Sequence, residues 1–175
     1  MKSTWRLIVA LMFVLTLAAC KSTPVAEPVA ETPAPPPKTD VDTKAAPDPH
    51  DYADARNFDN PESLLSKRVI YFDFDKSTVR PEFRGIISAH SAYAKAHSGA
   101  RVTLEGHADE RGTREYNLGL GERRGNAVDG LMSAQGARSD QLTVVSYGEE
   151  RPVCRVSDDE CWSLNRRVEI VYTSK

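Results

Sequence analysis

Eight of the chain's eleven prolines lie between Pro24 and Pro49, and this clustering restricts where the chain can fold. The residues among them are mainly Ala, Glu, Asp, Thr and Val, which bury too little apolar surface for a packed core. Residues 20–66 are therefore predicted to form a tether, with one short helical turn at residues 61–65 that docks on the domain. The remaining residues, 67–175, suffice for one domain with a single core.

The first residues of the chain, 1–19, have the features of a targeting segment. Lys2 and Arg6 precede an apolar run that is too short to span a bilayer. The leucine and two alanines before Cys20 resemble a bacterial lipobox, which implies cleavage before Cys20 and lipidation of its thiol. Lys21 at the next position implies sorting to the outer membrane. The alternative is an ordinary secretory signal that happens to end at a cysteine.

Residues 67–175 contain hydrophobic patterns of two periods, and their order predicts the fold class. Alternating or β-branched runs indicate strands, and apolar residues at 3.6-residue spacing indicate helices. The order β-α-β-α-β-β predicts an α+β fold, a two-layer α/β sandwich with two helices on one face of a mixed four-stranded sheet. The predicted strands are 69–74, 101–105, 142–147 and 167–172, and the predicted helices are 83–97 and 114–136.

The second predicted helix carries an arginine where an apolar side chain is expected. Leu120, Ala127 and Leu131 fall on one helical face, and Arg124 lies on the same stripe. A guanidinium held against an apolar face must find an anion, because an unpaired buried charge costs several kcal/mol. Asn117, seven residues upstream, projects in nearly the same direction.

The loop before this helix offers such an anion. Asp109 lies close to the predicted N-terminal end of the helix, and two interpretations are open. Asp109 and Arg124 form a structural ion pair that holds the loop to the helix, or they line a pocket for a ligand. Together with Asn117, the pocket would present an anion, a cation and an amide, which suit a zwitterionic ligand.

Several spaced motifs between residues 69 and 172 resemble a known family, the OmpA-like peptidoglycan-binding domains. The helix is similar to that family's motif Asn-x-x-Leu-Ser-x-x-Arg-Ala. The loop and the start of the helix resemble one branch more closely, the peptidoglycan-associated lipoproteins (Pal) of the Tol–Pal system. The residues that carry the resemblance are Asn117, Leu120, Gly121, Arg124 and Gly125, with segments 71–76, 106–113, 115–117 and 165–167.

The resemblance implies that the ligand is diaminopimelate in a peptidoglycan stem peptide. Asp109 would accept from its ammonium and Arg124 would bind its carboxylate in forked geometry. Backbone amides around Phe74 and Asp75 would meet a second carboxylate, although Phe74 is equally compatible with a core position. Asn117 and Leu120 would support Arg124 and contact the peptide. His107 and Glu110 would line the rim of the pocket.

The same resemblance implies partners in the bacterial envelope. A protein of the Pal branch links the outer membrane to the cell wall, supports constriction at cell division, and contacts TolB and possibly TolA. TolB would compete with peptidoglycan for this neighbourhood. The residues assigned to the TolB contact are Glu110, Arg111, Thr113 and Glu115. The alternative within the family is a generic OmpA-like anchor outside the Tol system.

Two cysteines remain besides Cys20, namely Cys154 and Cys161. We expect them to form a disulfide in an oxidising compartment, since a zinc site would require a second ligand pair nearby. Four glycines in the second helix, each costing about 1 kcal/mol relative to alanine, suggest a helix that is held by tertiary packing and less stiff than in relatives. They are Gly119, Gly121, Gly125 and Gly130.

Other function classes have little support in the sequence. His107, Asp109 and Glu110 cluster in one loop, which leaves a metal-dependent hydrolase as a weak alternative, but neighbouring loop positions rarely converge on a metal. We find no nucleophile elbow, phosphate loop or cofactor motif. Without residues 1–19, which carry two positive charges, the formal net charge changes from −2 to −4, and no basic run indicates nucleic acid.

Overall fold

The computed structural model describes residues 46–175. The predicted targeting segment, Cys20 and most of the predicted tether lie outside this range. Within the described range, no helix combines the length and the hydropathy needed to cross a membrane.

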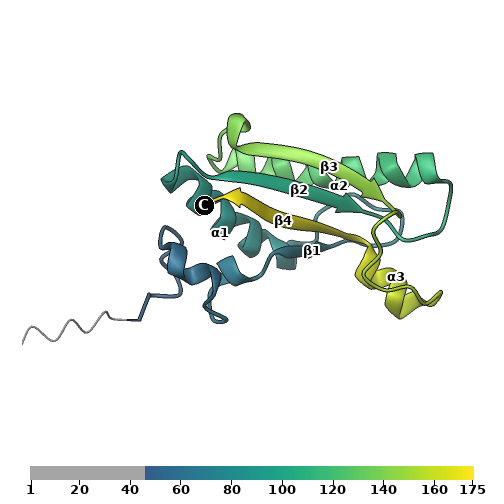
Figure 1. Ribbon diagram of the computed structural model, residues 1–175, viewed down its shortest axis with the longest axis horizontal. Helices are drawn as coiled ribbons and strands as arrows, with labels where there is room; N and C mark the ends of the chain where they lie inside the picture. The colour runs from purple at the N-terminus through teal and green to yellow at the C-terminus, as the bar shows by residue number, and fades with distance from the viewer. Residues whose placement is uncertain (1–45) are drawn as a thin grey trace, which may run out of the picture. The chain divides into compact units, whose positions relative to one another are not determined.

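The described residues form two layers, with helices on one face of a mixed sheet (Figure 1). The strand order in the sheet is β1-β4-β2-β3; β2 and β3 are parallel, and β4 is antiparallel to both β1 and β2. This architecture confirms the predicted fold class. The elements are β1 (Val69–Tyr71), α1 (Arg84–Ala96), β2 (Arg101–His107), α2 (Arg114–Ala134), β3 (Leu142–Gly148), α3 (Asp159–Asn165) and β4 (Arg167–Ser174), with 3-10 helices at Ala55–Phe58, Leu64–Ser66, Pro81–Phe83 and Ser139–Gln141.

The main hydrophobic core lies between the sheet and the two long helices. Alternate residues of β2 and β4 point into it, as the period of two requires. From α2 the buried apolar side chains are Val128 and Met132, whereas the predicted Ala127 and Leu131 pack at its edge. The fully buried members include Ile70, Ile87, Val102, Leu104 and Val168.

Helix α2 approaches the sheet closely because glycines face each other across the interface. A Cβ on Gly106 would lie 2.0 Å from the carbonyl oxygen of Gly121, and a Cβ on Gly121 would lie 2.4 Å from the Ser146 Oγ. At Gly125 an added Cβ would meet a Val144 methyl at 2.5 Å. Two of the glycines that weaken the helix as an isolated segment, Gly121 and Gly125, therefore permit its contact with β2 and β3.

Residues before β1 take part in the packing, which corrects the predicted end of the tether at residue 66. Phe58 and Leu65 are buried against Ala89 and Tyr93 of α1. The docking turn predicted at residues 61–65 is present as the 3-10 helix Leu64–Ser66, with Leu65 buried. The packing extends further upstream to Phe58, which was not predicted because a single apolar residue in a polar, proline-containing stretch gives no periodic pattern.

Two further differences concern the ends of elements. Strand β1 stops at Tyr71, and the predicted extension to Phe74 leaves the sheet and enters a loop. Helix α3 was not predicted, although Asp158 caps its first turn by accepting from the backbone amide of Cys161. Both differences lie at the same end of the sheet, where the candidate site is found (Figure 1).

Candidate binding site

Three segments converge at this end of the sheet: the loop after β1, the loop between β2 and α2, and helix α3. The two loops and the first turns of α2 surround a cavity of about 230 Å³. The residues that line it are Phe74, Asp75, Asp109, Arg111, Gly112, Tyr116, Asn117, Leu120 and Arg124. We call this cavity the Asp109 pocket.

The guanidinium of Arg124 is fixed by backbone carbonyl groups. Its Nε donates to the carbonyl of Lys76 at 2.8 Å, Nη1 to that of His107 at 2.7 Å, and Nη2 to that of Asp73 at 3.1 Å. The ring of Phe72 lies 5.3 Å from the guanidinium carbon. Burial lowers the pKa of Arg124 to about 10, so the side chain is still charged near neutral pH. Arg124 therefore joins the loop after β1 to the end of β2.

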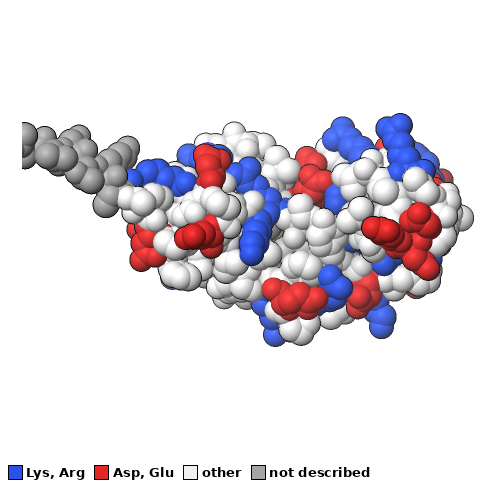
Figure 2. All heavy atoms as spheres, turned by 90° about the horizontal axis from the view of Figure 1, so that it is seen from below, with Lys and Arg blue, Asp and Glu red and all other residues white. Residues whose placement is uncertain are grey.

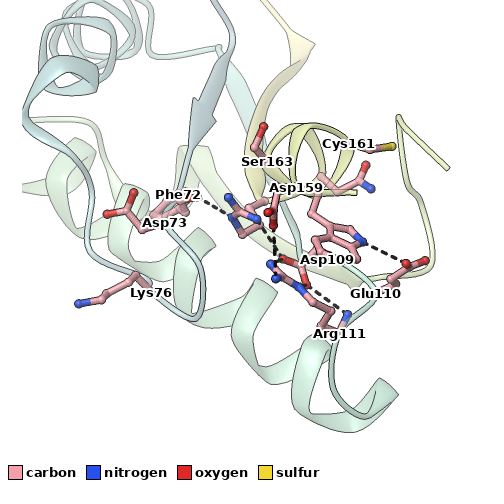
Figure 3. Close-up of polar contacts among 12 residues, drawn as sticks. Phe72, Asp73, Lys76, Asp109, Glu110, Arg111, Asp159, Cys161 and Ser163 are labelled. Atoms are coloured by element: carbon pink, nitrogen blue, oxygen red, sulfur yellow. Dashed lines mark hydrogen bonds and ion pairs between the residues drawn. The ribbon is translucent and has the colours of Figure 1, made fainter. Parts of the chain in front are cut away.

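Asp109 is buried beside two other arginines. Its Oδ2 accepts from Arg111 Nη2 at 2.7 Å and from Arg166 Nη1 at 3.2 Å, as Figure 3 shows for the polar contacts around Asp109. Burial acts to raise the pKa of the Asp109 carboxyl, but the bonds from Arg111 and Arg166 lower it below its ordinary value. The open alternative of a direct Asp109–Arg124 pair is wrong, because Arg124 is bound by carbonyls and Asp109 by Arg111 and Arg166.

Arg111 connects the pocket to helix α3. Its guanidinium carbon lies 4.0 Å from the centre of the Phe74 ring and 4.1 Å from that of the Trp162 ring. The indole of Trp162 donates to Glu110 at 3.0 Å, and Ser157 also donates to Glu110, at 2.6 Å (Figure 3 shows Glu110 beside α3). These contacts couple the loop before α2 to α3.

The loop after β1 supplies an exposed aromatic side chain and a turn. Phe74 is 55% exposed, so its alternative assignment to the core is wrong. Asp75 has a positive φ of 54°, which Asp tolerates better than most residues, and its carboxylate accepts from the Tyr116 hydroxyl. Neither the Phe74 amide nor the Asp75 amide donates to any group within residues 46–175. Two backbone donors are thus free at the pocket.

Asn117 and Leu120 line the pocket from α2, as expected for residues beside Arg124, but neither forms a hydrogen bond with Arg124. The amide of Asn117 donates to Glu149 Oε2 at 2.5 Å. Leu120 is buried and supplies an apolar wall. Support of Arg124 comes from the three carbonyl groups instead.

The six residues predicted to bind peptidoglycan all line the Asp109 pocket, and their roles in binding stay predictions. The two rim residues do not line it. His107 is buried on the opposite side of β2, beside Tyr147, and contributes its carbonyl to Arg124. Glu110 turns toward α3. His107, Asp109 and Glu110 therefore point in different directions, and the described part of the chain holds no cluster of three or more potential metal ligands.

Of the four residues assigned to the TolB contact, only Arg111 lines the pocket. Glu110, Thr113 and Glu115 are exposed, and Arg111 is half-buried. Thr113 caps α2 by accepting from the Tyr116 amide at 3.2 Å. Their assignment stays a prediction.

The predicted disulfide is present between Cys154 and Cys161, with the Cα atoms 5.1 Å apart. It closes the loop that leads into α3 and thus belongs to the structure around Trp162. Trp162, Arg166 and Tyr116 are the site residues that sequence reasoning missed. Arg166 and Tyr116 stand inside segments that carried the family resemblance, so this signal was available, whereas no pattern marked Trp162.

Charges of both signs are mixed over the face seen in Figure 2. Lys and Arg side chains alternate there with Asp and Glu side chains and with uncharged surface. This face carries no continuous basic stripe of the kind that follows a phosphate backbone.

Comparison with known proteins places this fold and pocket in a family. The model of the OmpA family matches residues 71–166, so the chain belongs to this family. The chain is 48% identical over 108 residues to the peptidoglycan-associated lipoprotein of Pseudomonas aeruginosa, covering 62% of this chain and 64% of that protein. It is 44% identical over 104 residues to the protein of the same name from Pasteurella multocida, covering 59% and 69%.

A solved structure supports the same relationship. The crystal structure of the peptidoglycan-associated lipoprotein from Burkholderia pseudomallei matches with a TM-score of 0.65 and 40% identity, covering 66% of this chain and 98% of that one. The match to the Pseudomonas aeruginosa protein spans about 64% of that relative's length. The sequence-based recognition of an OmpA-like domain similar to these lipoproteins is confirmed.

Proposed function

We propose that this chain is an envelope lipoprotein whose domain binds peptidoglycan non-covalently in the Asp109 pocket. The observation that carries the proposal is a cavity lined by one carboxylate and one guanidinium, in a domain similar to proteins named peptidoglycan-associated lipoprotein. Those relatives are named as lipoproteins associated with peptidoglycan, and the name describes no enzyme activity.

Diaminopimelate in the stem peptide fits these charges. Its free ammonium would pair with Asp109, and its free carboxylate would pair with Arg124. A guanidinium has five N–H groups, and three hydrogen bonds to carbonyls leave two for a ligand. The free amides of Phe74 and Asp75 would bind a second carboxylate, which supports the assignment of these two residues.

Retention on purified sacculi tests the pocket. Asp109→Asn keeps the size of the side chain but removes the charge, so we expect most of the protein to stay in the supernatant while the wild type sediments. Asp140→Asn is the matched control, because Asp140 pairs with Arg138 on the surface, away from the pocket. Equal sedimentation of Asp109→Asn and the wild type would show that the pocket assignment is wrong.

Sacculi with a different stem peptide test the ligand. Lysine at the third position lacks the terminal carboxylate that Arg124 would bind, so we expect retention on lysine-type sacculi to fall by about tenfold, as for the loss of one charge-assisted contact. Undiminished retention on lysine-type sacculi would exclude diaminopimelate as the determinant.

The lipid anchor belongs to the same proposal, although Cys20 lies outside the described residues. Cleavage before Cys20 and acylation would hold the domain at the outer membrane, facing the periplasm, since Lys21 follows the cysteine. Incorporation of labelled palmitate, lost in Cys20→Ser, tests acylation. Separation of inner from outer membranes tests the location.

A role in the Tol system is the finer form of the proposal, and a generic anchor is its alternative. The exposure of Glu110, Thr113 and Glu115, which lie next to pocket-lining residues in the chain, supports a protein contact beside the pocket. TolB should co-purify with the chain, and a stem peptide should displace it if the two sites overlap. No association with TolB or TolA under any condition would favour the generic anchor over a role in linking the envelope during division.

A further inference from the structure

The carboxylate that would receive the ligand's ammonium is already fully hydrogen-bonded. Oδ1 of Asp109 accepts from the Arg111 amide at 3.1 Å and from Arg111 Nε at 3.2 Å. Oδ2 accepts from Arg111 Nη2 at 2.7 Å and from Arg166 Nη1 at 3.2 Å. A carboxylate offers about four acceptor positions. An incoming ammonium can therefore bind only after one of these donors has released an acceptor position on the carboxylate.

Of the donors around Asp109, the guanidinium of Arg111 is the one that can leave. Arg166 is held elsewhere by its own Nε, which donates to the Phe72 carbonyl at 3.1 Å, and its side chain is 14% exposed. The Arg111 side chain is 31% exposed and lines the pocket itself. Its guanidinium is held by stacking between Phe74 and Trp162, contacts that leave its N–H groups free to change partner.

A second carboxylate lies within reach of the same guanidinium. Arg111 Nη1 is 3.9 Å from Asp159 Oδ1, at the start of α3, and the Asp159 side chain is 94% exposed. Figure 3 shows Asp109 and Asp159 on neighbouring elements close to the Arg111 side chain. The guanidinium thus has an inner partner in the pocket and an outer partner at the surface.

We propose that Arg111 is an internal competitor that occupies the ammonium position of the pocket and determines which ligands enter. This inference rests on the proposed function. In the inner position Arg111 binds Asp109 and the pocket is closed to cations. A ligand's ammonium takes Asp109, and the guanidinium moves toward Asp159 while it stays between the two rings.

The competitor makes the pocket selective for zwitterions. A ligand with an ammonium alone exchanges one ion pair on Asp109 for another and gains little. A ligand that also carries a carboxylate gains the free N–H groups of Arg124 and the amides of Phe74 and Asp75 in addition. Arg111 therefore discriminates against simple amines, which the charge of Asp109 by itself would attract.

Calorimetric titration of the full chain in detergent with free diaminopimelate and with 1,5-diaminopentane tests the proposal. Removing the competitor in Arg111→Gln should tighten diaminopimelate binding by about tenfold, the factor expected if about a tenth of the wild type is in the open state. The same variant should also gain measurable binding of the diamine. Arg114→Gln is the matched control, because Arg114 is exposed at the start of α2 and pairs with Glu150.

Substitution of Asp159, the outer partner, provides a second and independent test. Asp159→Asn removes the alternative partner without touching the pocket, and we expect diaminopimelate binding to weaken by about twofold, as for an exposed ion pair. In the wild type, diaminopimelate should shift the indole N–H resonance of Trp162 as the guanidinium moves. Trp162→Phe assigns that resonance.

The possible results separate the inference from the proposed function. If the wild type binds diaminopimelate and Arg111→Gln binds it equally or more weakly, Arg111 is a ligand contact or a bystander, and the inference is overturned. If neither protein binds diaminopimelate and the wild type fails to sediment with sacculi, the proposed function fails as well.

Discussion

The two ends of the sheet both contain buried polar side chains, but they use them differently (Figure 1). At the end where α1 meets the segment before β1, His90 bonds to the Lys67 carbonyl at 2.9 Å and to the Tyr172 hydroxyl at 3.0 Å. At the pocket end the buried polar groups include the charged side chains of Arg124 and Asp109. The first end thus relies on a neutral ring, whereas the second also buries charged groups.

The two ends differ in whether their buried groups can exchange a hydrogen-bond partner within the protein for a ligand. Burial lowers the pKa of His90 to about 4, so the ring is neutral and both of its nitrogens are satisfied within the protein. A neutral, satisfied group has nothing to offer a ligand. The pocket end keeps charges that a ligand of opposite charge can bind, and it does so beside a cavity. Burial thus leaves the first end without a group that can bind a ligand, whereas the second end keeps charged groups beside a cavity.

The largest expected effect comes from removing the charge at the pocket end. Arg124→Met leaves three carbonyl acceptors without their donor, and we expect the free energy of unfolding to fall by about 3 kcal/mol. Urea denaturation measures this loss. Arg124→Lys keeps the charge but cannot reach all three carbonyls, and should lie between Arg124→Met and the wild type. An unchanged midpoint for Arg124→Met would show that the carbonyls are satisfied without it.

Two buried histidines, His90 at the first end and His107 at the pocket end, should determine the response to acid. The folded pKa of His90, about 4, lies below the unfolded value of about 6.5, so the unfolded chain binds more protons between these values. Stability should therefore fall as the pH drops from about 6.5 to about 4, by about 3 kcal/mol for this residue. Burial also lowers the pKa of His107 to about 4.

Replacing these histidines one at a time sharpens the comparison. His90→Gln should flatten part of the pH dependence of the unfolding free energy, and the further change His107→Gln should flatten the rest. Denaturation at several pH values between 4 and 7 measures both slopes. A slope that survives in the double variant would assign the acid response to the carboxylates of the pocket end.

The disulfide supports the pocket end through α3. Replacing Cys154 and Cys161 by serine should lower the free energy of unfolding by about 2.5 kcal/mol, the chain-entropy value for so short a loop. Thermal denaturation with and without reductant measures the loss, and the reductant should have no effect on the double variant. If the double variant is as stable as the wild type but binds diaminopimelate more weakly, the disulfide acts only through the position of Trp162.

The smallest effect is expected on α2, which runs between the two ends. Gly130 has nothing within 4 Å of an added Cβ, so Gly130→Ala should stabilise the chain by up to about 1 kcal/mol. Gly125→Ala should destabilise it, because Val144 lies in the way, and Val144→Ala should relieve that cost. Equal effects of the two alanine substitutions would show that the helix can move away from the sheet.

Local patterns in the sequence predicted the four strands and the two long helices, and the family resemblance added to these patterns to predict the six residues around the pocket. Period and turn residues define each element, and an arginine on an apolar stripe identifies Arg124 as a residue with special partners. The partners themselves were not predictable. Every residue has a carbonyl group, so no pattern marks those of Asp73, Lys76 and His107 as the acceptors.

Contacts between distant segments account for the other differences. Asp109 meets Arg166 across 57 residues of chain, and Glu110 meets Trp162 across 52. The burial of Phe58 and Leu65 depends on a groove that α1 provides only after folding. For Gly121 and Gly125 of α2, the sequence showed the low helix propensity. It did not show that these two residues lie against the sheet.

The packing of Phe58 and Leu65 on α1 has a mechanical consequence. Figure 1 shows this segment at one end of the sheet and the start of α2 at the other. A force between the segment and a ligand held at the start of α2 would act along the strands, so the three residue pairs of β1 with β4 would be loaded in shear and resist together.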